Sequence, residues 1–138
     1  MNIQTNTAAQ YINPTDMVET TRNGYSQAVI APAGKRMAYI SGQTANYHEG
    51  AITPDFDAQV LEAYANLAKV LDSMNARPDQ VVKLTTYVVD HDPSKFPILV
   101  KAVMDLFGDA RPAQSLVPVP CLAVPGLKFE VEAVVAID

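Results

Sequence analysis

The chain has 138 residues, of which 49% are hydrophobic and 18% are charged, and its formal net charge is −5. This length and composition predict a single domain over residues 1–138, with a loop-like segment at 1–22, and exclude a disordered chain. The negative charge and the absence of any run of Lys and Arg argue against binding to nucleic acid or to an anionic membrane. The polar first twenty residues contain no signal peptide, and no apolar run approaches the ~20 residues of a membrane span, so we expect a cytoplasmic protein.

The first half of the chain predicts two strands followed by a long helix. Residues 26–31 alternate as a strand, and residues 36–41 form a second one after a short Pro/Gly turn, so the pair is typical of a hairpin. A further short strand is possible around Tyr11. We expect Thr53 to cap a helix that has Pro54 in its first position. The helix carries an apolar stripe at helical spacing that consists of Phe56, Val60, Leu61, Tyr64, Leu67, Leu71 and Met74.

The second half predicts a strand, a helix and two further strands. Residues 81–89 are rich in β-branched side chains and indicate a central strand, and a helix follows over 94–107. The strand predicted at 114–122 contains two prolines and therefore suits a sheet edge, and 127–137 alternates as the last strand. The order ββαβαββ predicts an α+β fold in which both helices cover one face of a mixed sheet. The other face keeps apolar side chains, which we expect an oligomer to cover.

Two glutamates near the C-terminus are the best candidates for chemistry. Glu130 and Glu132 leave the same face of the last strand, about 7 Å apart by strand rise, while Phe129 and its alternate neighbours face the helices. One interpretation is a solvated or ion-paired edge, with Lys128 on the same face. The functional interpretation is an interface pocket in which one carboxylate orients a water molecule.

Other candidates depend on weaker patterns. Ser41 and Gly42 end a strand, where glycine lets the backbone approach a ligand and the serine hydroxyl can donate or accept a hydrogen bond. Tyr25 suits a packed ring or a site residue. The single cysteine, Cys121, is interpreted as a small buried hydrophobic residue rather than a nucleophile. The cluster at 90–92 has metal-ligand residue types but is typical of a solvated turn, and we expect neither a metal nor a nucleotide or flavin cofactor.

An ordered set of short motifs covers most of the chain from Arg22 to Ile137. It includes Gly24-Tyr25-Ser26-Gln27, Ser41-Gly42-Gln43, Pro112-Ala113-x-Ser115, Pro125-Gly126 and Glu130-x-Glu132. In this order and spacing, the set resembles the RidA (YjgF, reactive-intermediate deaminase) family. The resemblance implies a chorismate-mutase-like fold and a homotrimeric barrel with the helices outside. It also implies clefts between subunits in which small imines or enamines are hydrolysed without a cofactor.

The resemblance also suggests which residues form the site. It implies that the carboxylate of Glu130 directs water onto an imine and that Tyr25 lines the cleft. It further implies that backbone groups of Ser115 and Leu116 line the cleft. The candidate substrate-binding residues are Tyr25, Ser41, Gly42, Gln114, Ser115 and Leu116.

The chain departs from the family pattern at two positions. Deaminating members carry an arginine where this chain has Gln114, and many carry an asparagine where it has Val100. Arginine clamps a carboxylate with two charged hydrogen bonds, and replacing it with a neutral amide costs roughly 1.5–3 kcal/mol. Arg111 precedes Pro112 at the wrong offset to replace it. We therefore expect weak activity on 2-imino acids.

Three functions remain open from the sequence. The first is a hydrolase for a small imine, enamine or related compound that lacks the usual carboxylate recognition. The second is a non-catalytic metabolite-binding or regulatory trimer. The third, a ribonuclease, is disfavoured by the acidic charge and by the lack of a basic groove.

Overall fold

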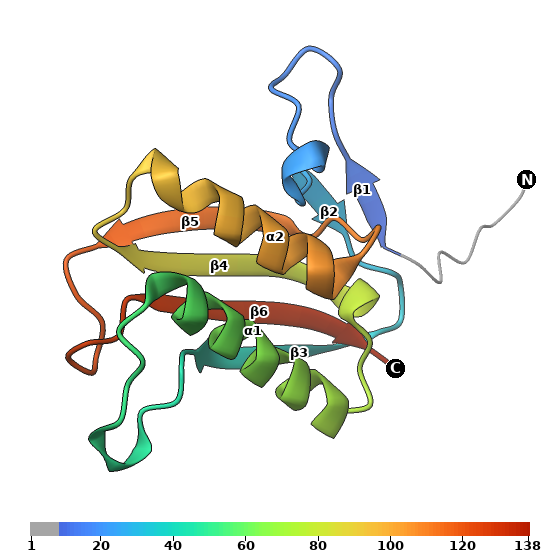
Figure 1. The fold of residues 1–138 in the computed structure, drawn as a ribbon. Coiled ribbons are helices and arrows are strands. Elements are labelled where there is room, and N and C mark those ends of the chain that lie inside the picture. Colours follow the sequence, from blue (N-terminus) through green and yellow to red (C-terminus); the bar gives the residue numbers. More distant parts are fainter. Residues whose placement is uncertain (1–8) are drawn as a thin grey trace, which may run out of the picture.

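A computed structural model describes residues 9–138 of the chain (Figure 1). No helix in this range is long and apolar enough to cross a membrane. Residues 1–8 of the predicted loop-like segment lie outside the described residues, and the rest of that segment contains a short strand. The main elements in chain order are β1 (Gln10–Ile12), β2 (Ala28–Ile30), β3 (Arg36–Gln43), α1 (Phe56–Ser73), β4 (Val81–Val89), α2 (Phe96–Phe107), β5 (Ala113–Val119) and β6 (Phe129–Ile137).

The main sheet has four strands in the order β3-β6-β4-β5. β4 and β5 run parallel, whereas β6 is antiparallel to both of its neighbours. Both helices lie on one face of this sheet (Figure 1), and their apolar sides form the core with alternate residues of β4 and β6. The predicted mixed sheet, one-sided helical layer, central strand and proline-containing edge strand are therefore confirmed.

The open face of the sheet carries apolar side chains that no helix covers. Tyr39 is 78% exposed, Met37 39% and Val117 38%. Glu130 and Glu132 share this face, because Val131 and Ala133 between and beyond them are buried against the helices. The prediction that this face keeps apolar side chains without a helix to cover them is confirmed.

The predicted hairpin of residues 26–31 and 36–41 is wrong. β2 pairs with β1, with Tyr11 opposite Val29, and β3 pairs with β6 instead. The backbone N–H of Ser26 donates to Pro112 O at 3.1 Å, which holds the start of β2 beside β5. β3 forms a long ladder with β6, whose inner side chains are buried, and that pairing outweighs a local turn.

Both helices begin later than predicted. The N-cap of α1 is Asp55, whose carboxylate accepts from Ala58 N at 2.9 Å, so Thr53 and Pro54 precede the helix. Asp55 is favoured over Thr53 as the N-cap because its charged oxygen suits the positive end of the helix dipole. A 3₁₀ turn at Pro93–Lys95 precedes α2. Leu61, assigned to the apolar stripe of α1, is 48% exposed and lies outside the core.

Candidate functional site

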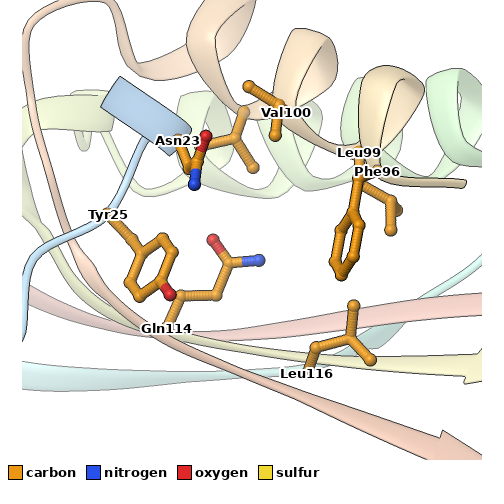
Figure 2. A pocket seen from close by; sticks show the side chains of 8 residues that line it. Asn23, Tyr25, Phe96, Leu99, Val100, Gln114 and Leu116 are labelled. Atoms are coloured by element: carbon orange, nitrogen blue, oxygen red, sulfur yellow. The ribbon is translucent and has the colours of Figure 1, made fainter. Parts of the chain in front are cut away.

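A cavity of about 360 Å³ lies between α2 and the inner face of β5 (Figure 2). Its wall is mainly apolar, and no charged residue lines it within the described chain. The lining residues are Asn23, Tyr25, Phe96, Leu99, Val100, Val103, Gln114 and Leu116. The predicted residues Tyr25, Gln114 and Leu116 therefore come together in one place.

Tyr25 reaches the cavity because the preceding loop packs closely on α2. A 3₁₀ turn at Thr21–Asn23 ends at Gly24, which has φ +93°. An added Cβ at Gly24 would lie 2.8 Å from Val103 Cγ1, so both the backbone conformation and the space require glycine. Tyr25, the next residue, lines the cavity (Figure 2).

Arg111 holds the same loop in place. Its guanidinium donates to the carbonyls of Thr21 at 2.6 Å, Gly108 at 2.6 Å and Ala110 at 2.9 Å. The guanidinium of Arg111, the only arginine near Gln114 in the sequence, is therefore hydrogen-bonded to backbone carbonyls. The prediction that Arg111 points elsewhere is confirmed, and Arg111 supplies no cation to the cavity.

Gln114 lies on β5 opposite Leu84, a buried residue of β4, and so faces the helices. Figure 2 shows its amide pointing into the cavity between Tyr25 and Phe96. Within residues 9–138, no hydrogen bond engages the side chain of Gln114, Tyr25 or Asn23. These three neutral polar groups are therefore free to bind a ligand in an otherwise apolar cavity.

The carboxylate part of the site lies on the opposite face of the sheet. The ladder between β3 and β6 shifts register between Ile40 and Gln43, so Ser41 and Gly42 form an irregularity there. An added Cβ at Gly42 would lie 2.5 Å from Glu130 Cδ. The bare backbone of Gly42 is thus the surface against which the Glu130 carboxyl lies. The predicted residues Gly42 and Glu130 come together here.

The surroundings of Glu130 favour its protonated form. Partial burial raises the pKa of the Glu130 carboxyl, and the nearby charge of Glu132 raises it further. Glu132 accepts a hydrogen bond from Tyr87 Oη at 2.6 Å, which raises the pKa of the Tyr87 hydroxyl. Among the described residues Lys128 forms no ion pair with the glutamates, and its Nζ donates instead to Pro54 O at 3.0 Å.

A single copy of the chain does not bring Gln114 and Glu130 together. Gln114 shares the helix-covered face with its partner Leu84, whereas Glu130 shares the open face with its partner Tyr87. Successive residues of β4 point to opposite faces, so the two candidates lie on opposite sides of the sheet. We refer to the cavity residues Tyr25, Gln114 and Leu116 as the amide half-site, and to Gly42 and Glu130 as the carboxylate half-site.

Ser115 contributes no side chain to the cavity. Its hydroxyl lies on the open face and accepts from Lys83 Nζ at 3.0 Å. Leu116, the next residue, points into the cavity.

Two further sequence candidates play other parts. The described residues contain no group of three His, Cys, Asp or Glu side chains that could hold a metal. Asp92 accepts from Ser94 N at 2.7 Å and caps a 3₁₀ turn, while the His91 ring packs edge-on against Phe96.

Cys121 is exposed, so the prediction that it is buried is wrong. β5 ends at Val119 because Pro118 and Pro120 lack amide donors, which leaves Cys121 in the following loop.

The sequence named Val100 of the α2 wall as a departure from the family pattern, but it did not single out the rest of that wall or Asn23 as cavity residues. Phe96, Val100 and Val103 have the i, i+4, i+7 spacing of one helix face, which is typical of a buried core face. Phe96 is 47% exposed and lines the cavity, whereas Val103 lines the cavity and also belongs to the core. No single-sequence pattern distinguishes these two uses of a stripe.

Comparison with known proteins identifies relatives over most of the chain. The family model described as Endoribonuclease L-PSP matches residues 17–137. A protein of the RutC family from Aquifex aeolicus is 31% identical over 109 residues, which are 78% of this chain and 82% of that protein.

Solved structures agree with the family match. A Yersinia pestis protein of unknown function from the conserved Rid family, YyfB, is 34% identical and has a TM-score of 0.86. The alignment covers 94% of this chain and 98% of that one. A Mycobacterium tuberculosis protein of the YjgF family is 27% identical with a TM-score of 0.62, over 94% of this chain and all of its own.

Proposed function

The chain belongs to the RidA/YjgF family, whose model is described as Endoribonuclease L-PSP, and we propose that it hydrolyses small neutral imines or enamines. The observation that carries this proposal is the neutral amide of Gln114 in an uncharged, largely apolar cavity. Such a site suits an uncharged group that both donates and accepts hydrogen bonds, with an apolar substituent beside it. It offers no cation to a carboxylate.

We propose that the two half-sites meet between copies of the chain in a homotrimer. The amide half-site opens on one side of the sheet and the carboxylate half-site lies on the other, so a second copy has to complete the site. The exposed apolar side chains of Tyr39, Met37 and Val117 surround the open face and favour its burial in such an assembly. In this arrangement Glu130 of one copy would face the cavity of its neighbour.

The chemistry assigned to Glu130 is proton transfer to and from water. The imine nitrogen first takes a proton from solvent; the Glu130 carboxylate then takes a proton from water as the hydroxide adds to the C=N carbon, which gives a carbinolamine. Glu130 gives this proton to the amine nitrogen, and as the C–N bond breaks the carboxylate takes the hydroxyl proton and returns it to solvent, so that ammonia leaves a carbonyl product. A carboxyl whose pKa is raised suits both steps, because it holds and releases a proton more readily near neutral pH. An enamine enters the same sequence after protonation at carbon.

A pair of substrates that differ only in charge tests the proposal. We expect the wild-type protein to clear 2-iminopropanamide faster than freshly generated 2-iminopropanoate, measured as ammonia release. Gln114→Arg should raise kcat/KM for the carboxylate by up to about two orders of magnitude and reverse the preference. Gln114→Leu is the control without hydrogen bonds and should lose the amide preference with no gain on the carboxylate.

Two outcomes would contradict the proposed function. A wild-type protein that clears 2-iminopropanoate faster than the amide would show that Gln114 does not decide the substrate class. Binding of the amide without ammonia release, unchanged in Glu130→Gln, would instead indicate a metabolite-binding trimer. RNA cleavage, the activity in the family model's description, is disfavoured because the net charge is −5 and the described cavity has no cation.

A further inference from the structure

Glu130 lies between two neighbours on the open face of the sheet. β6 runs between β3 and β4, so Gly42 borders Glu130 on one side and Tyr87 on the other. Tyr87 is the register partner of Glu130, but its hydroxyl donates to Glu132 at 2.6 Å. The Tyr87 backbone is therefore paired with Glu130, while its side-chain hydroxyl bonds to Glu132.

We propose that Tyr87 is a positioning residue for Glu130, because its hydroxyl anchors the Glu132 carboxylate on the sheet face that Glu130 shares. The inference rests on the proposed role of Glu130 in proton transfer. Tyr87 touches neither the cavity nor a reacting atom in this arrangement, and acts only through the two glutamates.

The other charged and titratable groups on this face do not neutralise the pair. Lys83 on β4 donates to Ser115 Oγ at 3.0 Å. Tyr39 on β3 is 78% exposed, and β5 brings only Ala113, Ser115, Val117 and Val119 to the face. Glu132 therefore acts on Glu130 as a like charge at a fixed place. Partial burial raises the pKa of the Glu130 carboxyl, and the charge of Glu132 raises it further.

The anchoring matters for a proton-transfer role. A carboxylate free to rotate into water would have its charge screened, and its effect on Glu130 would fall. A hydrogen bond of 2.6 Å from the Tyr87 phenol opposes that rotation and holds the Glu132 carboxylate at the sheet face. Tyr87 thus helps keep the proton on Glu130 to higher pH.

Carbon-detected NMR of protein labelled at the Glu carboxyl carbons tests this inference. The titration midpoint of Glu130, assigned with Glu130→Gln, is measured in the wild type, Tyr87→Phe and Glu132→Gln. We expect the midpoint to shift downward in Tyr87→Phe, which keeps the ring but loses the anchor, and at least as far in Glu132→Gln, which loses the charge. The matched control is Tyr39→Phe, which removes a tyrosine hydroxyl from the same face without touching the pair and should leave the midpoint unchanged.

An unchanged Glu130 midpoint in Tyr87→Phe, with a wild-type circular dichroism spectrum, would overturn the inference. Tyr87→Leu serves as a second variant that removes both the anchor and the ring, and it too should shift the midpoint downward. The acidic limb of a kcat/KM profile on 2-iminopropanamide should move in the same direction. If the midpoint shifts but Glu130→Gln still turns over substrate, the positioning stands and the proposed catalytic role of Glu130 fails.

Discussion

At the scale of single residues, Gly42 leaves the space that the Glu130 carboxyl occupies. A Cβ there would lie 2.5 Å from Glu130 Cδ and 2.8 Å from Oε1. Gly42 does not have a left-handed backbone, so alanine is tolerated by the main chain and its effect falls on Glu130 alone. We expect Gly42→Ala to cost at most about 1 kcal/mol in the free energy of unfolding, because the end of the Glu130 side chain can turn away, and to lower imine hydrolysis for the same reason.

A double-mutant cycle isolates this contact. In a Glu130→Ala background the clash is absent, so urea denaturation should give Gly42→Ala a cost close to zero. An equal cost in both backgrounds would mean that the main chain of the irregularity at Ser41–Gly42, rather than the space beside Glu130, requires glycine.

At the scale of elements, the observed start of α1 can be separated from the predicted one. Asp55 accepts from Ala58 N with its side chain, whereas Thr53 contributes only its backbone carbonyl, to Gln59 Nε2 at 2.9 Å. We therefore expect Asp55→Ala to lower the free energy of unfolding by about 1 kcal/mol. Thr53→Ala, the control, should change it by less than about 0.5 kcal/mol. The opposite order in thermal unfolding would make Thr53 the true N-cap.

Elements with a strong local pattern were predictable from the sequence, and elements set by distant partners were not. The strand 81–89 is correct to the residue because a β-branched run carries its own signal. The pairing of β2 with β1 was missed. The chain just before β2 is held by the bond from Ser26 to Pro112, and these two residues are far apart in the sequence. The fully buried Gln59 was missed too, since its three bonds go to backbone groups of Thr53, Gly126 and Lys128.

At the scale of the whole molecule, the sequence predicted which candidate residues come together better than how the two groups are arranged. Tyr25, Gln114 and Leu116 do share a cavity, and Gly42 does lie against Glu130. Alternation in the last strand placed Glu130 on the open face, but the side on which Gln114 lies follows from its register with Leu84, which no single-sequence motif contains. The proposed site therefore depends on assembly.

Assembly gives the last prediction. We expect size-exclusion chromatography with light scattering to show a trimer at micromolar concentration, because the open sheet face carries exposed Tyr39, Met37 and Val117. Tyr39→Asp should produce monomers, since it places a third carboxylate on the face that already holds Glu130 and Glu132, and burying that charge unpaired is costly.

Tyr47→Asp is the matched control, because Tyr47 is 50% exposed in the loop after β3 and should leave the trimer intact. A wild-type monomer would remove the shared site, whereas a trimer that survives Tyr39→Asp would place the interface on another surface. Loss of imine hydrolysis together with the trimer would tie the activity to the meeting of the two half-sites.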